Sequence, residues 1–376
     1  MRYLTSDIVY TAVSPPIKQG VLVVDDKGTI QDVLKQSDVA RENLEYFPGA
    51  LCPGFINTHC HLELSHLENK IEKRTGLSQF IREIVGQRDA PVKDILDSIN
   101  KADQMMYDNG IVAVADISNT SLSFSCKENS LIHYHTFIEI FGSKPEYAHS
   151  LFSQGLELKK KSQHPCSLTP HATYSVSDAL FKILKEQNKG QIVSIHNQET
   201  QSEDEMFINA SGTLLEGLPY FHHFKASGQS ALKSTLPKLP IAPILLVHNT
   251  FTKREDIFWA QSQRSNIFWA TCPKANLFIE NTLPTYSDFI KSEAKMTIGT
   301  DSLASNDSLS ILEEMKVINS HVPLPLLIQW ACKNGAEFLG LDKLGSFQKG
   351  KRPGVNHLIG LENDQLTPNS HVCRIA

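Results

Sequence analysis

Five residues with metal-binding side chains stand where short apolar runs of the sequence end. They are His59, His61, His196, His248 and Asp301. Imidazole nitrogens and a carboxylate oxygen suit Zn²⁺ or Fe²⁺, and such a ligand set leaves a coordination position for water. A divalent ion lowers the pKa of its bound water to about 7 and so supplies a nucleophile at neutral pH. We therefore expect these residues to form a metal centre for hydrolysis.

The apolar runs that carry these residues have the length and composition of buried β-strands. Eight of them follow residue 53, at 54–61, 111–118, 133–142, 167–174, 192–199, 244–250, 267–276 and 296–302. Between them lie segments with apolar residues three and four positions apart, such as 78–89, 178–189 and 309–322, which predict helices. The alternation predicts an α/β fold, a (β/α)8 TIM barrel.

The metal-binding residues would share one end of this barrel. His59 and His61 are two positions apart, and side chains at that spacing point to the same side of a strand. His196, His248 and Asp301 end the fifth, sixth and eighth runs. A single histidine at a strand end is usually structural. Several in register on different strands favour a site, because barrel enzymes build active sites at the carboxyl ends of their strands.

The two ends of the chain have a different pattern, of short strands and turns. The run at 20–34 contains Asp-Asp-Lys-Gly at its centre, which predicts a β-hairpin. The segment after Gly345 returns to strand-and-turn character, and we expect it to pair with the N-terminal strands. The sequence therefore predicts a small composite β-sandwich domain from residues 1–52 and 346–376, beside a barrel domain of residues 53–345.

The overall composition excludes several classes of protein. A net charge of −5 gives no electrostatic reason to expect a nucleic-acid partner. The sequence has no signal-peptide pattern and no apolar stretch of the roughly 20 residues that would cross a membrane. Its seven cysteines are scattered, so we expect reduced thiols in a cytoplasmic protein.

Five motifs, in order along the chain, resemble the amidohydrolase superfamily in its deaminase and chlorohydrolase branch. They are PGFINTHCHLEL, SIHNQET, LVHNT, TCPKANL and IGTDSLASN, and they span residues 53–306. The resemblance implies that His59, His61, His196 and Asp301 bind the metal, with Zn the favoured ion and Fe an alternative. Binuclear relatives carry a carboxylated lysine at the end of strand four. The corresponding run here, SLTPHATY, has no lysine, so we expect one ion.

Three residues are predicted to carry the chemistry around the ion. Glu199 lies three residues beyond His196, where its carboxyl group can move protons between water, a ring nitrogen and a departing amine. The resemblance assigns the same role to this HxxE glutamate. His248 would orient or polarise the water, and Asp301 would accept its proton as well as touching the ion. The next acids along the chain, Glu203, Asp204 and Glu205, are expected to be solvated.

A second group of residues is predicted to contact substrate. His171 ends the fourth run and matches a histidine that the deaminase branch uses for substrate contact. Glu63 and His66 follow the HxH pair, and Arg82 and Arg88 lie on the next helix, where a guanidinium can bind a carboxylate or hydroxyl group. Four further histidines are not expected in the metal site: His133 and His135 as structural residues, His222 and His223 as lid or surface residues.

The motif set most resembles the S-adenosylhomocysteine and aminodeoxyfutalosine deaminases. It implies hydrolytic deamination of an aminopurine nucleoside, a small-molecule substrate, and the homodimer in which such barrels often occur. Alternatives are a guanine-type deaminase or a triazine chlorohydrolase, since the same metal and acid would serve either. A catalytically silent barrel scaffold is the non-enzymatic alternative, but such proteins typically lose metal ligands and this chain keeps the full set.

Overall fold

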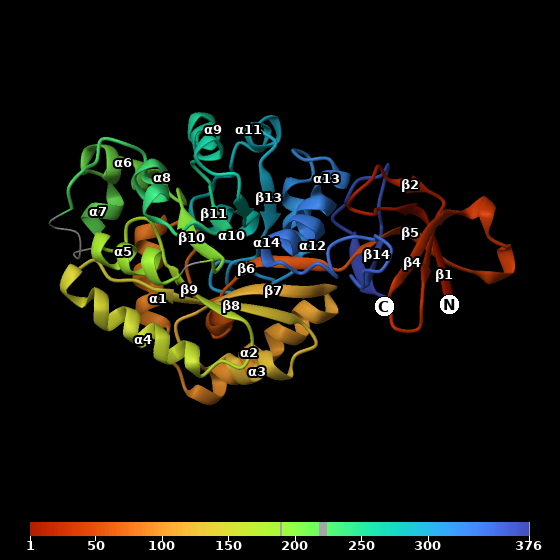
Figure 1. Cartoon of the computed structure of the whole chain (residues 1–376), viewed down its shortest axis with the longest axis horizontal. Helices are drawn as coiled ribbons and strands as arrows, with labels where there is room; N and C mark the ends of the chain where they lie inside the picture. Colours follow the sequence, from red (N-terminus) through yellow and green to blue (C-terminus); the bar gives the residue numbers. More distant parts are fainter. Residues whose placement is uncertain (189, 218–223, 376) are drawn as a thin grey trace.

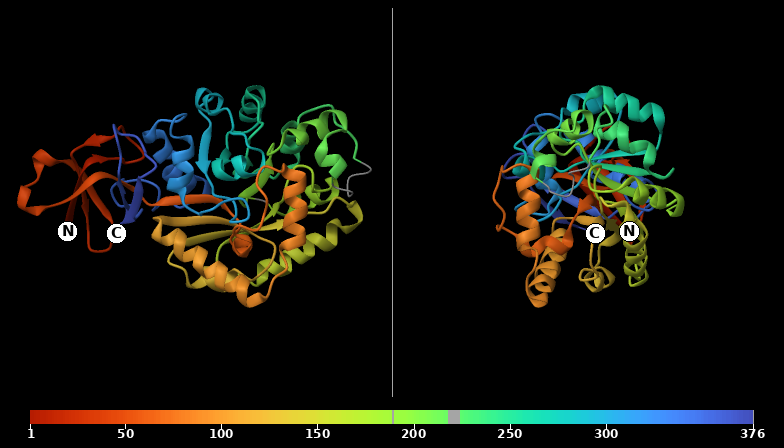
Figure 2. Two further views of the ribbon diagram at one scale, coloured as in Figure 1. Left: turned by 180° about the vertical axis from the view of Figure 1, so that it is seen from behind. Right: turned by 90° about the vertical axis from the view of Figure 1, so that its left-hand side faces the viewer.

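The computed structural model describes residues 1–188, 190–217 and 224–375. The predictions for His222 and His223 fall outside these ranges. The described chain contains a mixed sheet built from both ends of the sequence and a larger α/β region between them (Figure 1). In Figure 2 the mixed sheet lies at one end of the molecule, with the N- and C-termini close to each other.

The α/β region contains two four-stranded parallel sheets whose strands pair in chain order. The first sheet consists of β6 (Phe55–Cys60), β7 (Ile111–Ser118), β8 (His133–Ile140) and β9 (Cys166–Pro170). The second consists of β10 (Val193–Asn197), β11 (Ile244–His248), β12 (Ile267–Thr271) and β13 (Lys295–Ile298). Each predicted run therefore contains a strand, and the predicted α/β class is confirmed.

Helices follow every strand of this region and cover the sheets on the outside (Figure 1). In the first half they are η3 (Leu62–Leu67), α1 (Leu77–Gln87), α2 (Val92–Asp108), α3 (Phe124–Asn129), η4 (Pro145–Tyr147), α4 (Ala148–Lys160) and α5 (Asp178–Gln187). In the second half they are α6 (Gln201–Asn209), α7 (Thr213–Gly217), α8 (Ala231–Thr235), η6 (Leu236–Lys238), α9 (Arg254–Gln263), α10 (Pro273–Ile279), α11 (Tyr286–Lys291), α12 (Ile311–Ile318), α13 (Leu324–Ile328), η7 (Gln329–Asn334) and α14 (Gly335–Leu339).

Local chemistry explains where several of these elements begin and end. All eight residues of β7 are buried, which is typical of a parallel strand covered by helices on both faces. Ser177 caps α5 by accepting a hydrogen bond from the backbone N–H of Leu180. The strand predicted over 267–276 is too long, because Pro273 begins α10 at the first helical position, where its missing N–H costs nothing.

The two parallel sheets meet at two seams where isolated bridges join them. Ala172, after β9, pairs with His196 in β10, and Cys60 at the end of β6 pairs with Asp301, after β13. The backbone N–H groups of Thr300 and Asp301 both donate to the carbonyl oxygen of His59, at 2.9 and 3.0 Å. Within the described residues regular pairing stops at the seams, so the structure shows two linked sheets rather than a continuous barrel ladder.

The mixed sheet joins the ends of the chain, as the sequence predicts. Its strands lie in the order β15 (His371–Arg374), β14 (Val355–Ile359), β5 (Leu44–Pro53), β1 (Arg2–Val9), β3 (Gly20–Val24) and β4 (Ile30–Lys35), with β2 (Ile17–Lys18) beside β1 and the short helices η1 (Gln36–Asp38) and η2 (Arg41–Asn43) before β5. The predicted hairpin is β3 and β4, and in its turn Asp25 Oδ1 accepts from the N–H groups of Lys27 and Thr29. The described strands form one sheet, so the second layer of a sandwich stays a prediction.

Two general properties complete the fold. No helix within the described ranges combines the length and apolar character that crossing a membrane requires. The seven cysteines are all free thiols, four of them buried.

Candidate metal centre

Four histidines and one aspartate converge at the carboxyl ends of β6, β10, β11 and β13. The ring centroid of His59 lies 4.9 Å from that of His61, 4.9 Å from that of His196 and 5.6 Å from that of His248. Asp301 joins them because the seam between β13 and β6 holds its backbone N–H on the carbonyl oxygen of His59. The structure therefore brings together all the residues that the sequence predicts around the ion.

The ligand atoms in this cluster have the spacing that a tetrahedral site requires. The Nε2 atoms of His59 and His61 lie 3.2 Å apart. Asp301 Oδ1 lies 3.6 Å from His59 Nε2 and 3.4 Å from His61 Nε2. In a tetrahedral zinc site with bonds of about 2.1 Å, two ligand atoms lie about 3.4 Å apart. The chemistry and the spacing of these donors fit one divalent ion.

Hydrogen bonds from outside the cluster fix the orientation of several of its side chains. His196 Nδ1 lies 2.6 Å from the carbonyl oxygen of His171, and His248 Nδ1 lies 3.0 Å from Asn276 Oδ1. Both acceptors require a proton on Nδ1, which leaves Nε2 unprotonated and able to bind a metal. Ser305 Oγ donates to Asp301 Oδ2 at 2.5 Å.

Burial sets the protonation states that metal binding needs. Burial lowers the pKa of His59, of His248 and, to about 3, of His61, so these imidazoles are neutral at neutral pH. Burial alone would raise the pKa of Asp301, but its interactions with His59, His61 and His248 hold it below its usual range. Neutral imidazoles and an ionised carboxylate are the forms that coordinate a cation.

Glu199 lies beside this cluster, where the sequence predicts a proton carrier. Its Oε1 is 3.6 Å from His248 Nε2, and the side chain is buried. Burial, followed by the charges of Asp301 and Glu280, raises the pKa of Glu199 well above its usual value. The raised pKa favours the protonated form of this carboxyl group, which can donate its proton to a base in the pocket.

The prediction that Glu203 and Asp204 are solvated acids is wrong. Glu203 is fully buried and accepts hydrogen bonds from the backbone N–H of Glu199 at 2.7 Å and from Thr173 Oγ1 at 2.6 Å. Burial raises its pKa to about 8. Asp204 is also buried and accepts from Gln198 Nε2. The physical reason is that the start of α6 turns inward and caps the loop that carries Glu199.

The sequence contains a pattern that could have revealed Glu203. Thr200 and Glu203 have the spacing of a capping box, in which the glutamate three positions into a helix reaches back to a free backbone N–H. Here Glu203 reaches the N–H of Glu199, one residue before the N-cap Thr200. This carboxyl group therefore holds the backbone of Glu199, the predicted proton carrier, in place.

The residues predicted to contact substrate lie in different surroundings: His171 adjoins the cluster, whereas the others contact residues outside it. The ring centroid of His171 is 4.8 Å from that of His196. Arg88 Nη2 is 3.8 Å from Glu63 Oε1, and His66 Nε2 lies 3.0 Å from the carbonyl oxygen of Arg88. Arg82 is exposed, and its guanidinium donates to Gln79 and to the carbonyl oxygen of Gly217.

These contacts give Glu63 a structural task in addition to any contact with substrate. Its carboxylate accepts hydrogen bonds from the backbone N–H groups of Asn119 and Thr120 and from the Thr120 hydroxyl group. Glu63 thereby holds the loop after β7 against the loop after β6. Substrate contact by His171, Glu63, His66, Arg82 and Arg88 stays a prediction.

Sequence reasoning missed two buried acids near the site. Glu139 is buried near the end of β8, with Oε1 3.7 Å from His196 Nδ1. Burial raises its pKa to about 7. It ends an apolar run in the same way as the metal-binding residues, and that position could have identified it. Asp116 pairs with the buried Lys127 at 2.5 Å and accepts from the backbone N–H of Leu62, directly after His61.

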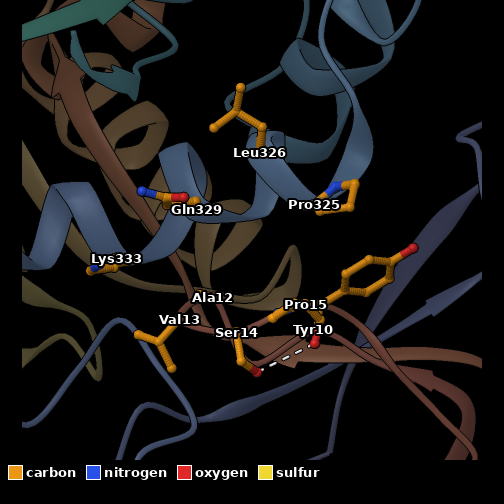
Figure 3. A pocket seen from close by; sticks show the side chains of 9 residues that line it. All are labelled: Tyr10, Ala12, Val13, Ser14, Pro15, Pro325, Leu326, Gln329 and Lys333. Atoms are coloured by element: carbon orange, nitrogen blue, oxygen red, sulfur yellow. Dashed lines mark hydrogen bonds between the residues drawn. The ribbon is translucent and has the colours of Figure 1, made fainter. Parts of the chain in front are cut away.

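A separate surface pocket lies away from the metal centre. It has a volume of about 330 Å³ and lies between the segment 10–15 and the helical segment 325–333 (Figure 3). Its ionisable lining residues are Tyr10 and Lys333. A pocket without carboxylate or imidazole groups has no acid–base pair for hydrolysis, so the histidine cluster is the candidate active site.

Comparisons with known proteins agree with this geometry. A model of the amidohydrolase family matches residues 50–358. An adenosine deaminase from Helicobacter pylori is 27% identical over 323 residues, which cover 81% of this chain and 78% of that protein.

Two solved structures share the fold. The structure of Helicobacter pylori aminofutalosine deaminase with methylthio-coformycin matches with a TM-score of 0.80 and 22% identity, over 96% of this chain and 93% of that chain. An atrazine chlorohydrolase from Arthrobacter aurescens, complexed with zinc, matches with a TM-score of 0.74 and 15% identity, over 96% of this chain and 88% of that chain.

Proposed function

This chain belongs to the amidohydrolase family, and we propose that it hydrolytically deaminates the adenine ring of an adenosine derivative and releases ammonia. The observation that carries the proposal is the buried Glu199, whose Oε1 lies 3.6 Å from His248 Nε2 beside the candidate metal-binding cluster. The similarity to an adenosine deaminase over 81% of the chain supports the reaction class, a hydrolase acting on carbon–nitrogen bonds.

Four residues would hold the ion: His59, His61, His196 and Asp301. The donor atoms of His59, His61 and Asp301 lie at tetrahedral spacing, His196 joins the same cluster, and the loop after β9 supplies no lysine for a second ion. We propose zinc, in line with the zinc in the structurally similar chlorohydrolase, and one ion per chain. When bound, zinc supplies Lewis acidity that makes a water molecule nucleophilic at neutral pH.

Glu199 would then move the protons that the reaction requires. It gives its proton to a ring nitrogen as water adds to the carbon that bears the amino group. The two protons of the water go to the departing amine and back to Glu199, so the products are ammonia and the oxo form of the ring. Asp301, ionised before the reaction, accepts the first of these protons and passes it to the departing amine, and His248 orients the attacking oxygen.

The proposal also covers the architecture of the chain, its location and its assembly. We propose that the eight parallel strands form a (β/α)8 barrel over residues 53–345, and the bridges at both seams support closure. The chain ends, 1–52 and 346–376, would form the composite β-sandwich domain, supported by the pairing of β14 with β5. The seven free thiols support a cytoplasmic location, and we propose a homodimer with neither nucleic acid nor membrane as partner.

An ammonia-release screen tests the proposed function. Purified protein loaded with zinc is incubated with adenosine, methylthioadenosine, S-adenosylhomocysteine, aminodeoxyfutalosine, guanine and, for chloride release, atrazine. We expect turnover of one or more of the four adenine nucleosides, and among them we propose S-adenosylhomocysteine or aminodeoxyfutalosine as the best substrate. Turnover of guanine or atrazine alone, or of no compound, would contradict the proposal.

A further inference from the structure

Glu139 is a buried carboxyl group that the proposed reaction leaves without a role. It lies one residue before the end of β8, at the same edge of the strands as the metal-binding residues, and only 8% of it is exposed. Asn119 Nδ2 donates to Glu139 Oε2 and to the carbonyl oxygen of Glu139, each at 3.2 Å. These two bonds hold the side chain in one orientation.

The other oxygen of this carboxylate lacks a hydrogen-bond donor among the described residues. Oε1 is 3.7 Å from His196 Nδ1, which already donates to the carbonyl oxygen of His171 at 2.6 Å. Buried polar atoms are almost always paired, because desolvation without a partner is costly. An unpaired carboxylate oxygen beside a catalytic cluster therefore indicates a place where a ligand supplies the donor.

A second metal ion does not fit this place. The donor atoms of Glu139, His171 and His196 lie within 4.8 Å of one another. However, His196 uses Nδ1 for the His171 carbonyl, which leaves its Nε2 for the cluster with His59 and His248. Glu139 and His171 alone would offer two ligands, fewer than the three or four protein ligands of a zinc site.

The surroundings of Glu139 suit a neutral polar group on a small molecule. His171 binds Ser175 Oγ through Nδ1 at 2.7 Å, so its Nε2 is the nitrogen left for a ligand. The ring centroids of Phe141 and Tyr174 lie 5.8 and 6.0 Å from that of His171, and 47% of Phe141 is exposed. Polar atoms flanked by aromatic rings are the usual lining of a small-molecule pocket.

We propose that Glu139 Oε1 accepts a hydrogen bond from a ribose hydroxyl group of the substrate. The inference rests on the proposed function, because an adenosine derivative carries two kinds of donor near its ring. The amino group reacts beside Glu199, whose carboxyl group lies at His248. Glu139 lies beside another histidine, His196, and therefore away from the reacting amino group. The donors of the substrate that are left to pair with it are the ribose hydroxyl groups. Glu139 would thus select ribosides over free bases and deoxyribosides.

The variant E139Q tests this role with little change in shape. The amide oxygen of the glutamine can still accept from Asn119, which places the NH2 group where Oε1 stood. That group cannot accept a hydrogen bond. The probes are the adenine riboside that the wild type turns over fastest in the ammonia screen and its 2′-deoxy and 3′-deoxy forms.

The expected result is a loss of discrimination. In the wild type, removing one of the two hydroxyl groups should lower kcat/KM about 10- to 100-fold, the usual effect of losing a hydrogen bond to a charged group. In E139Q the kcat/KM for the riboside should fall by a similar factor, and removal of the hydroxyl group should lower kcat/KM no further. A wild type that does not discriminate, or an E139Q that discriminates as the wild type does, would overturn the inference.

Three controls separate this outcome from other failures. E146Q, on an exposed acid of the loop after β8, should leave all rates unchanged. Metal content and thermal midpoint show whether E139Q is folded. If E139Q is not folded, E139D replaces it in the test. The shorter side chain keeps a carboxylate but moves its oxygen away from the ribose, so discrimination between riboside and deoxyriboside should fall. If the wild type deaminates no riboside, the proposed function itself has failed and the inference falls with it.

Discussion

The two parallel sheets contribute to the site in different ways. At the ends of β10, β11 and β13, four residues other than glycine have positive φ: Gln198 at 44°, His248 at 71°, Asn249 at 56° and Asp301 at 58°. At the ends of β6 to β9 the described non-glycine residues have none. We call the sheet of β10 to β13 the strained half and the sheet of β6 to β9 the relaxed half. Glu199 lies on the strained half, and Glu139, with its unpaired oxygen, lies on the relaxed half.

A dense hydrogen-bond network maintains the strained half. Gln198 Nε2 donates to Asp204 and to Asp256, and Asn249 Nδ2 donates to the carbonyl oxygens of Leu246 and Ala270. A non-glycine residue in this backbone region costs about 1–3 kcal/mol, which persists only where surrounding contacts determine the conformation. The comparison teaches that the proposed proton carrier is held by a dense hydrogen-bond network, while Glu139 keeps an unpaired oxygen.

The largest expected effect comes from removing a ligand on the strained half. In D301A the histidines lose the carboxylate that lies 3.4 Å from His61 Nε2, so metal content should fall well below one ion per chain and activity should be lost. H171A, on the other half, should retain its metal. Metal analysis by mass spectrometry and ammonia release measure both. Two ions per wild-type chain would contradict the single-ion prediction.

E199Q should have the next largest effect. The amide cannot exchange a proton with the ring nitrogen, so kcat should fall about 10²- to 10⁴-fold while metal content stays unchanged. The matched control is E216Q on the exposed face of α7, which should behave as the wild type. Activity retained in E199Q would assign the proton transfer to another group.

Glu203 tests whether the network positions Glu199. In E203A the backbone N–H of Glu199 and the Thr173 hydroxyl group lose their acceptor, and kcat should fall about 10- to 100-fold, the effect of breaking a buried hydrogen-bonded pair. E203Q should recover most of the rate, because its amide can accept from Glu199 and donate to Thr173. A rise in KM with kcat unchanged, or no rescue in E203Q, would refute a positioning role.

The last prediction concerns folding stability rather than activity, as a function of pH. Burial raises the pKa of Glu314 from 4.5 to about 8, so the folded chain retains a proton that the unfolded chain releases. The free energy of unfolding should therefore decrease between pH 4.5 and 8, by about 1.4 kcal/mol per pH unit for this group. Urea unfolding at pH 5, 6, 7 and 8 measures the slope. E314Q should flatten it, and an unchanged slope would show that the carboxyl group is solvated.

Much of the fold followed from the sequence because its determinants are local. Apolar runs predicted each of the eight parallel strands, and the turn at Asp25 predicted the hairpin of β3 and β4. Errors lay mainly at boundaries, as where Pro273 begins α10 inside a predicted strand. The links between the two parallel sheets depend on pairs such as Cys60 with Asp301, which lie far apart along the sequence.

The sequence by itself predicted the candidate metal-binding set, because the i, i+2 spacing of His59 and His61, the strand-end positions of the others and the family motifs that they resemble are all local properties. It also placed Glu199 three residues beyond His196. Only the tertiary structure decided which nearby acids are buried. Glu203 meets Thr173 across two loops, and Glu139 is held by Asn119 from the neighbouring strand's loop. Burial is a property of the neighbours in space, and those neighbours are distant along the chain.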